Sequence, residues 1–121
     1  MGGELIAAAH KRAFRDLLWG IKPLVGLRGS IPFPYVLTFL TVAVDEGKPV
    51  GSYAREMNVN RFIMSRYMRC IADRGRNGKA GLGLVTIKRT ANSPTKTAVF
   101  LTDKGRVIAA EVYRNLRGSA E

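Results

Sequence analysis

Residues 50–71, VGSYAREMNVNRFIMSRYMRCI, constrain the fold of this chain more than any other stretch. The first part spaces three residues as one face of a helix requires: Tyr53, Ala54 and Met57. The turn-forming run Asn58-Val59-Asn60 then interrupts the pattern, and Asn60 is suited to cap a following helix. The second part repeats apolar residues at i, i+4 and i+7, namely Met64, Met68 and Ile71. The stretch therefore predicts two short helices joined by a tight turn.

The outer face of the second helix is basic and rich in hydrogen-bonding groups. It carries Arg61, Phe62, Ser65, Arg66 and Arg69. No acidic residue between Asn60 and Ala72 balances the three arginines, whereas a face that is merely solvated usually mixes both signs. Together with the small Ala54 in the first helix and the apolar Val59 in the turn, this pattern predicts the helix-turn-helix used in DNA recognition. An ordinary solvated helical pair is the alternative.

The positive charge of the chain is concentrated in the same region. Lys and Arg number 20 against 9 Asp and Glu, a net charge of +11, which points to a polyanionic partner such as double-stranded DNA. Against Asp73 alone, residues 60–96 hold nine basic residues: Arg61, Arg66, Arg69, Arg74, Arg76, Lys79, Lys88, Arg89 and Lys96. The remaining 84 residues hold eleven basic and eight acidic residues, a net of only +3.

Length and composition favour one folded domain over residues 1–121, since domains cluster near ~100–150 residues. The 46% hydrophobic content excludes a wholly disordered chain, and no apolar run approaches the ~20 residues of a membrane-spanning helix. The N-terminus does not resemble a secretory signal, so we expect a cytoplasmic protein. Cys70 is the only cysteine, which rules out an internal disulfide and favours a small, partly buried apolar residue over a redox switch.

Helices are also expected before the helix-turn-helix. Residues 4–25 place their apolar side chains on one stripe: Leu5, Ile6, Ala9, Ala13, Leu17, Leu18 and Ile21. The polar face of this helix is basic, so an anionic membrane surface is a competing partner. Pro23 and the glycines that follow should close the helix. A second helix is expected over residues 35–45, with Pro34 in its first turn and Gly47 as its C-terminal cap.

A basic hairpin and a last helix follow the loop after the helix-turn-helix. Residues 84–89 and 97–101 are β-prone and predict a two-stranded wing with residues 90–96 at its tip. Thr102 is a natural N-cap for a helix that Gly118 should end.

The order helix, helix, helix-turn-helix, hairpin, helix is that of a winged helix. Over residues 35–116 the sequence resembles the MarR-type transcriptional regulators, through SYAREMNVNRFIMSRYMRCI, the strand end VTIKR and the passage VFLTDKGRVI. The resemblance implies an α+β fold, a mainly helical winged helix-turn-helix domain with a two-stranded wing, and the function of a DNA-binding transcriptional repressor. The wing reads ANSPTKT where that family usually carries an Asp-x-Arg element, which leaves a small-molecule effector open.

As a reader of duplex DNA, the helix over residues 60–71 would enter the major groove, whose width admits one helix. The wing, residues 84–101, would follow the adjacent minor groove or the backbone. The expected DNA-binding residues are Ser52, Tyr53, Asn60, Arg61, Phe62, Ser65, Arg66, Arg69, Arg76, Lys79, Lys88, Arg89, Asn92 and Lys96. Tyr53 also suits the core. We expect a homodimer built from residues 4–25 and 102–117, whose two readers meet successive major grooves ~34–36 Å apart.

No catalytic, cofactor-binding or metal site is expected, and the protein is not predicted to be an enzyme. His10 is the only histidine and stands beside Lys11, so a catalytic triad has little to build on. The run GRNGKA, residues 75–80, lacks the first glycine and the hydroxyl of a phosphate-binding loop. Asp45 and Glu46 are adjacent and would end a helix. Two other classes stay open: an architectural or centromere/partition-type DNA-binding protein of plasmid or phage kind, and an RNA-binding winged helix.

Overall fold

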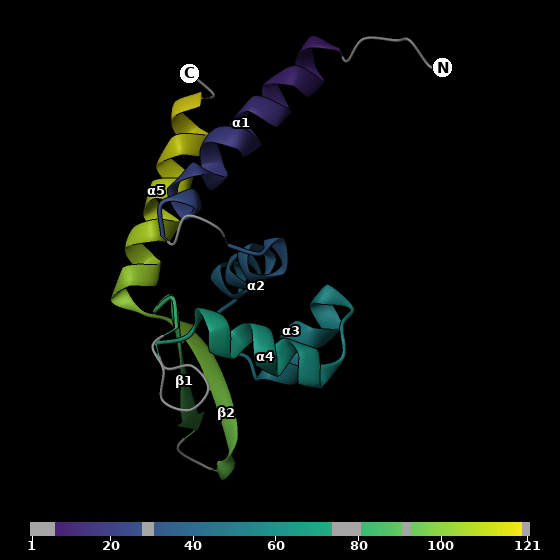
Figure 1. Cartoon of the computed structure of the whole chain (residues 1–121), viewed down its shortest axis with the longest axis vertical. Helices are drawn as coiled ribbons and strands as arrows, with labels where there is room; N and C mark the ends of the chain where they lie inside the picture. The colour runs from purple at the N-terminus through teal and green to yellow at the C-terminus, as the bar shows by residue number, and fades with distance from the viewer. Residues whose placement is uncertain (1–6, 28–30, 74–80, 91–92, 120–121) are drawn as a thin grey trace.

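The computed structural model describes residues 7–27, 31–73, 81–90 and 93–119. In this part of the chain the elements follow in the order α1 (Ala8–Val25), α2 (Phe33–Val44), α3 (Val50–Met57), α4 (Arg61–Ile71), β1 (Val85–Thr90), β2 (Ser93–Leu101) and α5 (Asp103–Ser119). Figure 1 shows α1 and α5 side by side at the end that carries both termini, and the wing of β1 and β2 at the opposite end. The predicted α+β winged helix-turn-helix is confirmed.

The core lies where α2, α3 and α4 meet the base of the wing. Side chains without exposed surface include Phe39, Val42, Met64, Met68, Ile71, Val85 and Val99. α2 folds as a helix despite its β-prone composition. Pro34 occupies its first turn, and the Thr38 hydroxyl donates to the Pro34 carbonyl at 2.7 Å. The one buried polar side chain of α2 is therefore satisfied within the helix.

The turn between α3 and α4 is shaped by one backbone conformation and two short-range hydrogen bonds. Asn58 takes a left-handed conformation with φ of 54°, which asparagine tolerates better than most residues. The Val59 N–H donates to the carbonyl of the buried Ala54 at 2.9 Å. The Asn60 side-chain oxygen accepts the Phe62 N–H at 2.6 Å and caps α4. Both short helices, their turn and the Asn60 cap are confirmed.

The wing is longer than predicted. The antiparallel register runs from Val85↔Leu101 to Arg89↔Thr97 and shifts before the pair Thr90↔Ser93. β2 therefore begins at Ser93, and the prediction that residues 90–96 form the tip is wrong. In the sequence Pro94 favours a loop over a strand. Both strands of a two-stranded ribbon are edge strands, however, and an edge strand tolerates a residue that lacks an N–H.

The segment before α3 joins the other edge of β2. The Gly47 N–H donates to the Val99 carbonyl at 2.8 Å, and the Val99 N–H donates to the Lys48 carbonyl at 3.0 Å. Gly47, with φ of 87°, thus turns the chain onto the wing. The prediction that Gly47 caps α2 is wrong. That cap is Asp45, whose N–H donates to the Val42 carbonyl at 3.1 Å.

The predicted end of α1 near residue 25 is confirmed, whereas the predicted end of α5 at Gly118 is wrong. α5 continues through Gly118 to Ser119, and Pro23 lies inside the last turn of α1. Proline lacks the N–H that would bind the carbonyl four residues back, which belongs to Trp19. The Asn115 side-chain amide of α5 donates to that carbonyl at 2.8 Å. A neighbouring helix therefore accommodates the proline.

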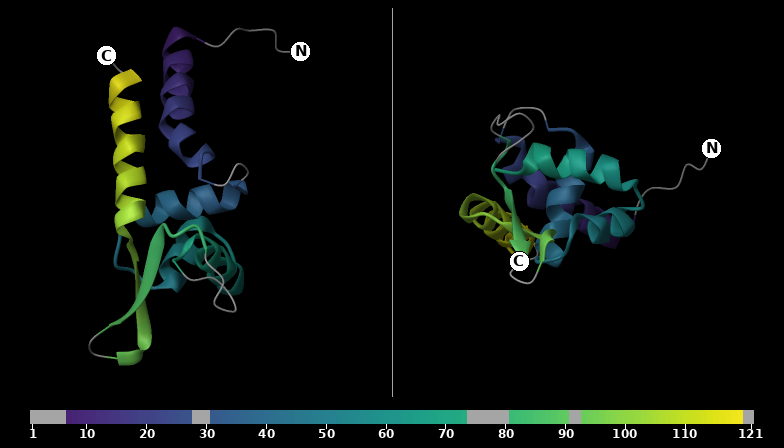
Figure 2. Two further views of the ribbon diagram at one scale, coloured as in Figure 1. Left: turned by 60° about the vertical axis from the view of Figure 1, so that its left-hand side comes forward. Right: turned by 90° about the horizontal axis from the view of Figure 1, so that it is seen from below.

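α1 and α5 pack closely at Gly20, where a Cβ would lie 2.8 Å from Cδ2 of Leu116. Figure 2 shows the two helices standing next to each other above α2. Within α1 only Gly20 and Leu24 are buried. The large apolar side chains that the pair exposes are Phe14, Leu17, Leu18, Trp19, Val25, Val107, Tyr113 and Leu116. None of the described helices is long and apolar enough to cross a membrane.

Candidate nucleic-acid interface

α4 turns its basic face to solvent. Met64, Met68 and Ile71 have no exposed surface, and this fixes the direction of the remaining side chains. The predicted reading residues of α4 lie on the outward side: Arg61, Phe62, Arg66 and Arg69 are exposed, and Ser65 is half-buried. The structure thus brings five of the predicted site residues onto one face.

Backbone contacts hold the first turn of α4 in place. Besides its cap on Phe62, Asn60 accepts the Met64 N–H on its carbonyl at 2.9 Å. The Asn60 side-chain oxygen is therefore used by the fold, and its NH₂ group remains for a base or phosphate. A leading turn held in this way loses little freedom when it binds.

At the start of α3 the two predicted contacts differ. Tyr53 is only 2% exposed, and its hydroxyl donates to the Asp45 carbonyl at 2.7 Å and accepts the Lys48 N–H at 3.2 Å. Burial raises the pKa of Tyr53. Tyr53 is therefore a core residue with no donor left for phosphate. Ser52 is half-buried, with its hydroxyl oxygen 3.5 Å from an Arg55 guanidinium nitrogen that donates to it.

The end of α4 is tied to the start of the wing. The Leu84 N–H donates to the Ile71 carbonyl at 2.8 Å. A Cβ on Gly81 would collide with the Ala72 carbonyl, so only glycine fits where the chain returns past the end of α4. These contacts fix α4 relative to the wing, at the end of the molecule away from the termini (Figure 2).

The wing carries cations on both of its faces. Lys88 and Arg89 are exposed neighbours on β1, and neighbouring strand residues point to opposite faces. The Lys88 ammonium lies 5.7 Å from the centre of the Phe100 ring. Lys96 is exposed in the irregular part of β2, where its carbonyl accepts the Thr90 hydroxyl at 3.5 Å. The predicted site residues outside the described part of the chain are Arg76, Lys79 and Asn92.

No protein-family model matches the sequence, and no curated protein matches it. Solved structures do. A MarR transcriptional regulator from Methanosarcina mazei Go1 matches with a TM-score of 0.62 and 15% identity, over 94% of this chain and 75% of that chain. The transcriptional regulator Tm0710 from Thermotoga maritima has a TM-score of 0.68 at 16% identity, over 91% and 70%. This is the MarR-type fold.

A further structure with this MarR-type fold contains nucleic acid. Streptococcus pneumoniae FabT, solved in complex with DNA, matches with a TM-score of 0.64 and 16% identity, over 93% of this chain and 75% of that chain. At identities this low the comparisons establish the fold.

Within the MarR-type fold, two acidic side chains, Asp45 and Glu46, bind partners outside α4. Glu46 accepts the Leu101 N–H at 2.8 Å, and the Arg106 guanidinium binds both of its oxygens, at 2.8 and 3.0 Å. Burial alone would raise the pKa of Glu46, but the Leu101 N–H and Arg106 outweigh it, and the pKa is lowered. Asp45 pairs with Lys48 at 3.5 Å. Glu46 thus joins the α2–α3 connection to the wing and to α5.

Sequence patterns missed Glu46 because its partner Arg106 is 60 residues away. They also missed Ile63, which is 40% exposed beside Phe62 and falls outside the buried spacing of α4. A third feature without a sequence signal is a groove of 350 Å³ between α2 and α3, lined by Leu37, Leu40, Thr41, Val44, Asp45, Lys48, Ser52, Tyr53 and Glu56. A molecule bound in this groove would contact α3, the helix that precedes α4.

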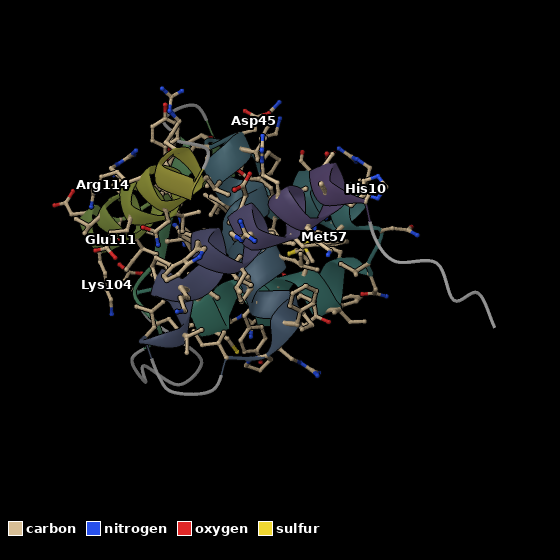
Figure 3. All side chains as sticks on the ribbon, turned by 90° about the horizontal axis from the view of Figure 1, so that it is seen from above. His10, Asp45, Met57, Lys104, Glu111 and Arg114 are labelled. Atoms are coloured by element: carbon tan, nitrogen blue, oxygen red, sulfur yellow. The ribbon has the colours of Figure 1, made fainter. Side chains whose placement is uncertain are left out.

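Histidine, cysteine and carboxylate side chains are spread out over the described residues. No group of three or more His, Cys, Asp or Glu side chains among them could hold a metal ion. Figure 3 shows His10 on α1 and Glu111 on α5 at opposite sides of the molecule. Cys70 is half-buried, as predicted, and a hydrogen bond with its side chain raises the pKa of Tyr35.

Proposed function

We propose that this protein is a homodimeric transcriptional regulator that binds double-stranded DNA in a sequence-specific manner and acts in the cytoplasm as a repressor. The observation that carries the proposal is the solvent-facing cationic side of α4 beside the basic wing, in a region with a single acidic residue. The MarR-type fold supports it, as does the DNA held by FabT. A repressor needs no further activity, since occupying a promoter site excludes other proteins.

In this proposal α4 lies in the major groove. Arg61, Phe62, Ser65 and Arg66 occupy its leading, outward part and contact bases and nearby phosphates, with Asn60 contributing its NH₂ group. Arg69, farther along, meets phosphate, and Ser52 donates to the backbone. The wing follows the adjacent minor groove or backbone through Lys88, Arg89 and Lys96, together with Arg76, Lys79 and Asn92.

The dimer is part of the same proposal. One reader spans only a few base pairs, whereas two readers related by a two-fold axis meet major grooves about 34–36 Å apart. α1 and α5 expose a run of apolar side chains at the end of the molecule away from the reader. A second copy of the chain would cover this surface, and residues 1–121 would act as one domain.

Selection of bound sequences from a random duplex pool tests the function directly. We expect enrichment of one short pseudo-palindrome, with log K falling against log salt at about −0.9 per phosphate contact. A flat salt response, or equal affinity for single strands, would overturn the proposal. Cooperative spreading over repeats would instead favour an architectural or partition role, and preference for RNA an RNA-binding one.

Side-chain removal then assigns roles within the selected site. Arg66→Ala should relax specificity at one base pair, at a cost of about 1–3 kcal/mol there. Lys96→Ala should weaken binding to all sequences alike and reduce the salt slope by about one contact. If both variants weaken all sequences uniformly, Arg66 contacts phosphate and not a base.

A further inference from the structure

Phe62 is the least expected side chain of α4. It is 84% exposed, although the same helix buries Met64, Met68 and Ile71 completely. Apart from Ile63, its exposed or half-buried neighbours on the outward face are charged or polar: Arg61, Ser65, Arg66 and Arg69. A phenyl ring in this position does not fill the core, and it offers no hydrogen bond to phosphate.

The backbone of Phe62 is nevertheless anchored. Its N–H is held by the Asn60 side chain at 2.6 Å, which anchors the second residue of α4. Ile63 follows at 40% exposure, so the leading edge of the helix presents two adjacent apolar side chains. Ser65 and Arg66 stand one turn behind Phe62 on the same side, because residues three and four apart are neighbours on a helix.

We propose that Phe62, flanked by Ile63, reads thymine through its C5-methyl group. The inference rests on the proposed function, with α4 in the major groove. There the four bases present hydrogen-bonding edges, and thymine alone adds an apolar group. A phenyl ring at the front of a cationic helix finds its apolar partner in that methyl, and the contact removes apolar surface of both groups from water. The bound site therefore contains a thymine at the base pair that the first turn of α4 meets.

Deoxyuridine provides the test, because it differs from thymidine only in lacking this methyl. Each thymine of a selected duplex is replaced in turn, and the dissociation constant is measured for the full-length protein. We expect one position per half-site at which uracil weakens binding about three- to fivefold, the factor expected for one buried methyl group. In Phe62→Ala the same substitution should change nothing, and thymine and uracil duplexes should bind alike.

Phe33→Ala is the matched control, because Phe33 begins α2 and is 65% exposed but lies outside the reading face. This variant should keep the full thymine preference, and circular dichroism should show that both variants fold. Two outcomes would overturn the inference: no position sensitive to uracil, or an unchanged preference in Phe62→Ala. Either leaves the proposed function intact as long as the protein binds its selected duplex, whereas loss of all duplex binding by the wild type would remove the function itself.

Discussion

The two ends of this molecule expose opposite kinds of surface. At the reading end, formed by α3, α4 and the wing, Met64, Met68 and Val99 are fully buried, and the exposed charged side chains described there are arginine and lysine except for Glu56. At the terminal end, formed by α1 and α5, Leu17 and Leu18 are more than half exposed, at 54% and 57%.

This difference in exposed surface determines whether each end is stable without a partner. Exposed charges keep their hydration, so the reading end is complete without a partner and is free to exchange water for phosphate. Exposed apolar surface costs roughly 25 cal/mol per Å² relative to burial. The terminal end is therefore the part of the molecule that gains most from a second copy, and the two ends should respond differently to substitution.

The largest effect is expected at the terminal end. Replacing Leu17 and Leu18 with Glu removes two side chains worth about 1.5–3 kcal/mol each when buried, so the dimer should weaken by more than a hundredfold. Light scattering over a concentration series measures this, with circular dichroism to follow helicity. The control reverses charge on the polar face of α1, Arg12→Glu with Arg15→Glu, and should leave the dimer intact. A wild type that is already monomeric at micromolar concentration rejects the interface, and a global loss of helicity would place the leucines in the core.

At the reading end the largest loss of stability is expected from substitutions in the buried core. Met68→Ala should lower the free energy of unfolding by about 2–5 kcal/mol, because it leaves a cavity among fully buried side chains. Val44→Ala, at the most exposed large apolar residue of α2, should change it by less than about 0.5 kcal/mol. Urea unfolding midpoints give both values. Equal losses in the two variants would show that Met68 does not belong to a tightly packed core.

Glu46 connects the two ends through Leu101 of the wing and Arg106 of α5. Its contribution to the free energy of unfolding should depend on pH. Its folded pKa is lowered, so its stabilisation is fully present above the unfolded value near 4.3 and is lost as pH falls through the folded value. Glu46→Gln should cost about 1 kcal/mol at pH 7, since the site is partly open to solvent. The difference from wild type should vanish at low pH.

Asp45→Asn is the control for Glu46, because both side chains of the Asp45–Lys48 pair are more than half exposed. It should cost less than Glu46→Gln at pH 7. A stability difference between Glu46→Gln and wild type that persists below pH 3 would show that packing, not charge, makes Glu46 stabilising.

The smallest effect on stability is expected at the hydrogen bond between Asn115 of α5 and Trp19 of α1. Asn115→Ala removes the donor that serves the Trp19 carbonyl, at a cost of about 0.5–1 kcal/mol, since water can replace it. Hydrogen exchange in the last turns of α1 should accelerate. In the Pro23→Ala background the helix regains its own N–H for that carbonyl, so Asn115→Ala should cost almost nothing. Additive costs would mean that Asn115 and Pro23 act independently.

Several features of the reading end follow from residues a few positions apart. The spacing of Met64, Met68 and Ile71 predicts the buried side of α4, and Asn60 predicts where the helix begins. Thr102 likewise predicts the start of α5, where its hydroxyl accepts the Gly105 N–H at 3.0 Å. These signals are visible in the sequence because a helix turn and its cap are completed within four residues.

The sequence by itself therefore determined the order of the elements, the outward cationic face and the concentration of charge on the reader. Only the tertiary structure decided that Tyr53 is a core residue, that Gly47 turns the chain onto the wing, and that Glu46 holds Arg106. It also decided that Pro23 remains inside α1, because its missing donor is replaced by Asn115, 96 positions from the Trp19 carbonyl that the amide serves. Such contacts depend on which helices meet in space, and no local spacing of residues encodes that meeting.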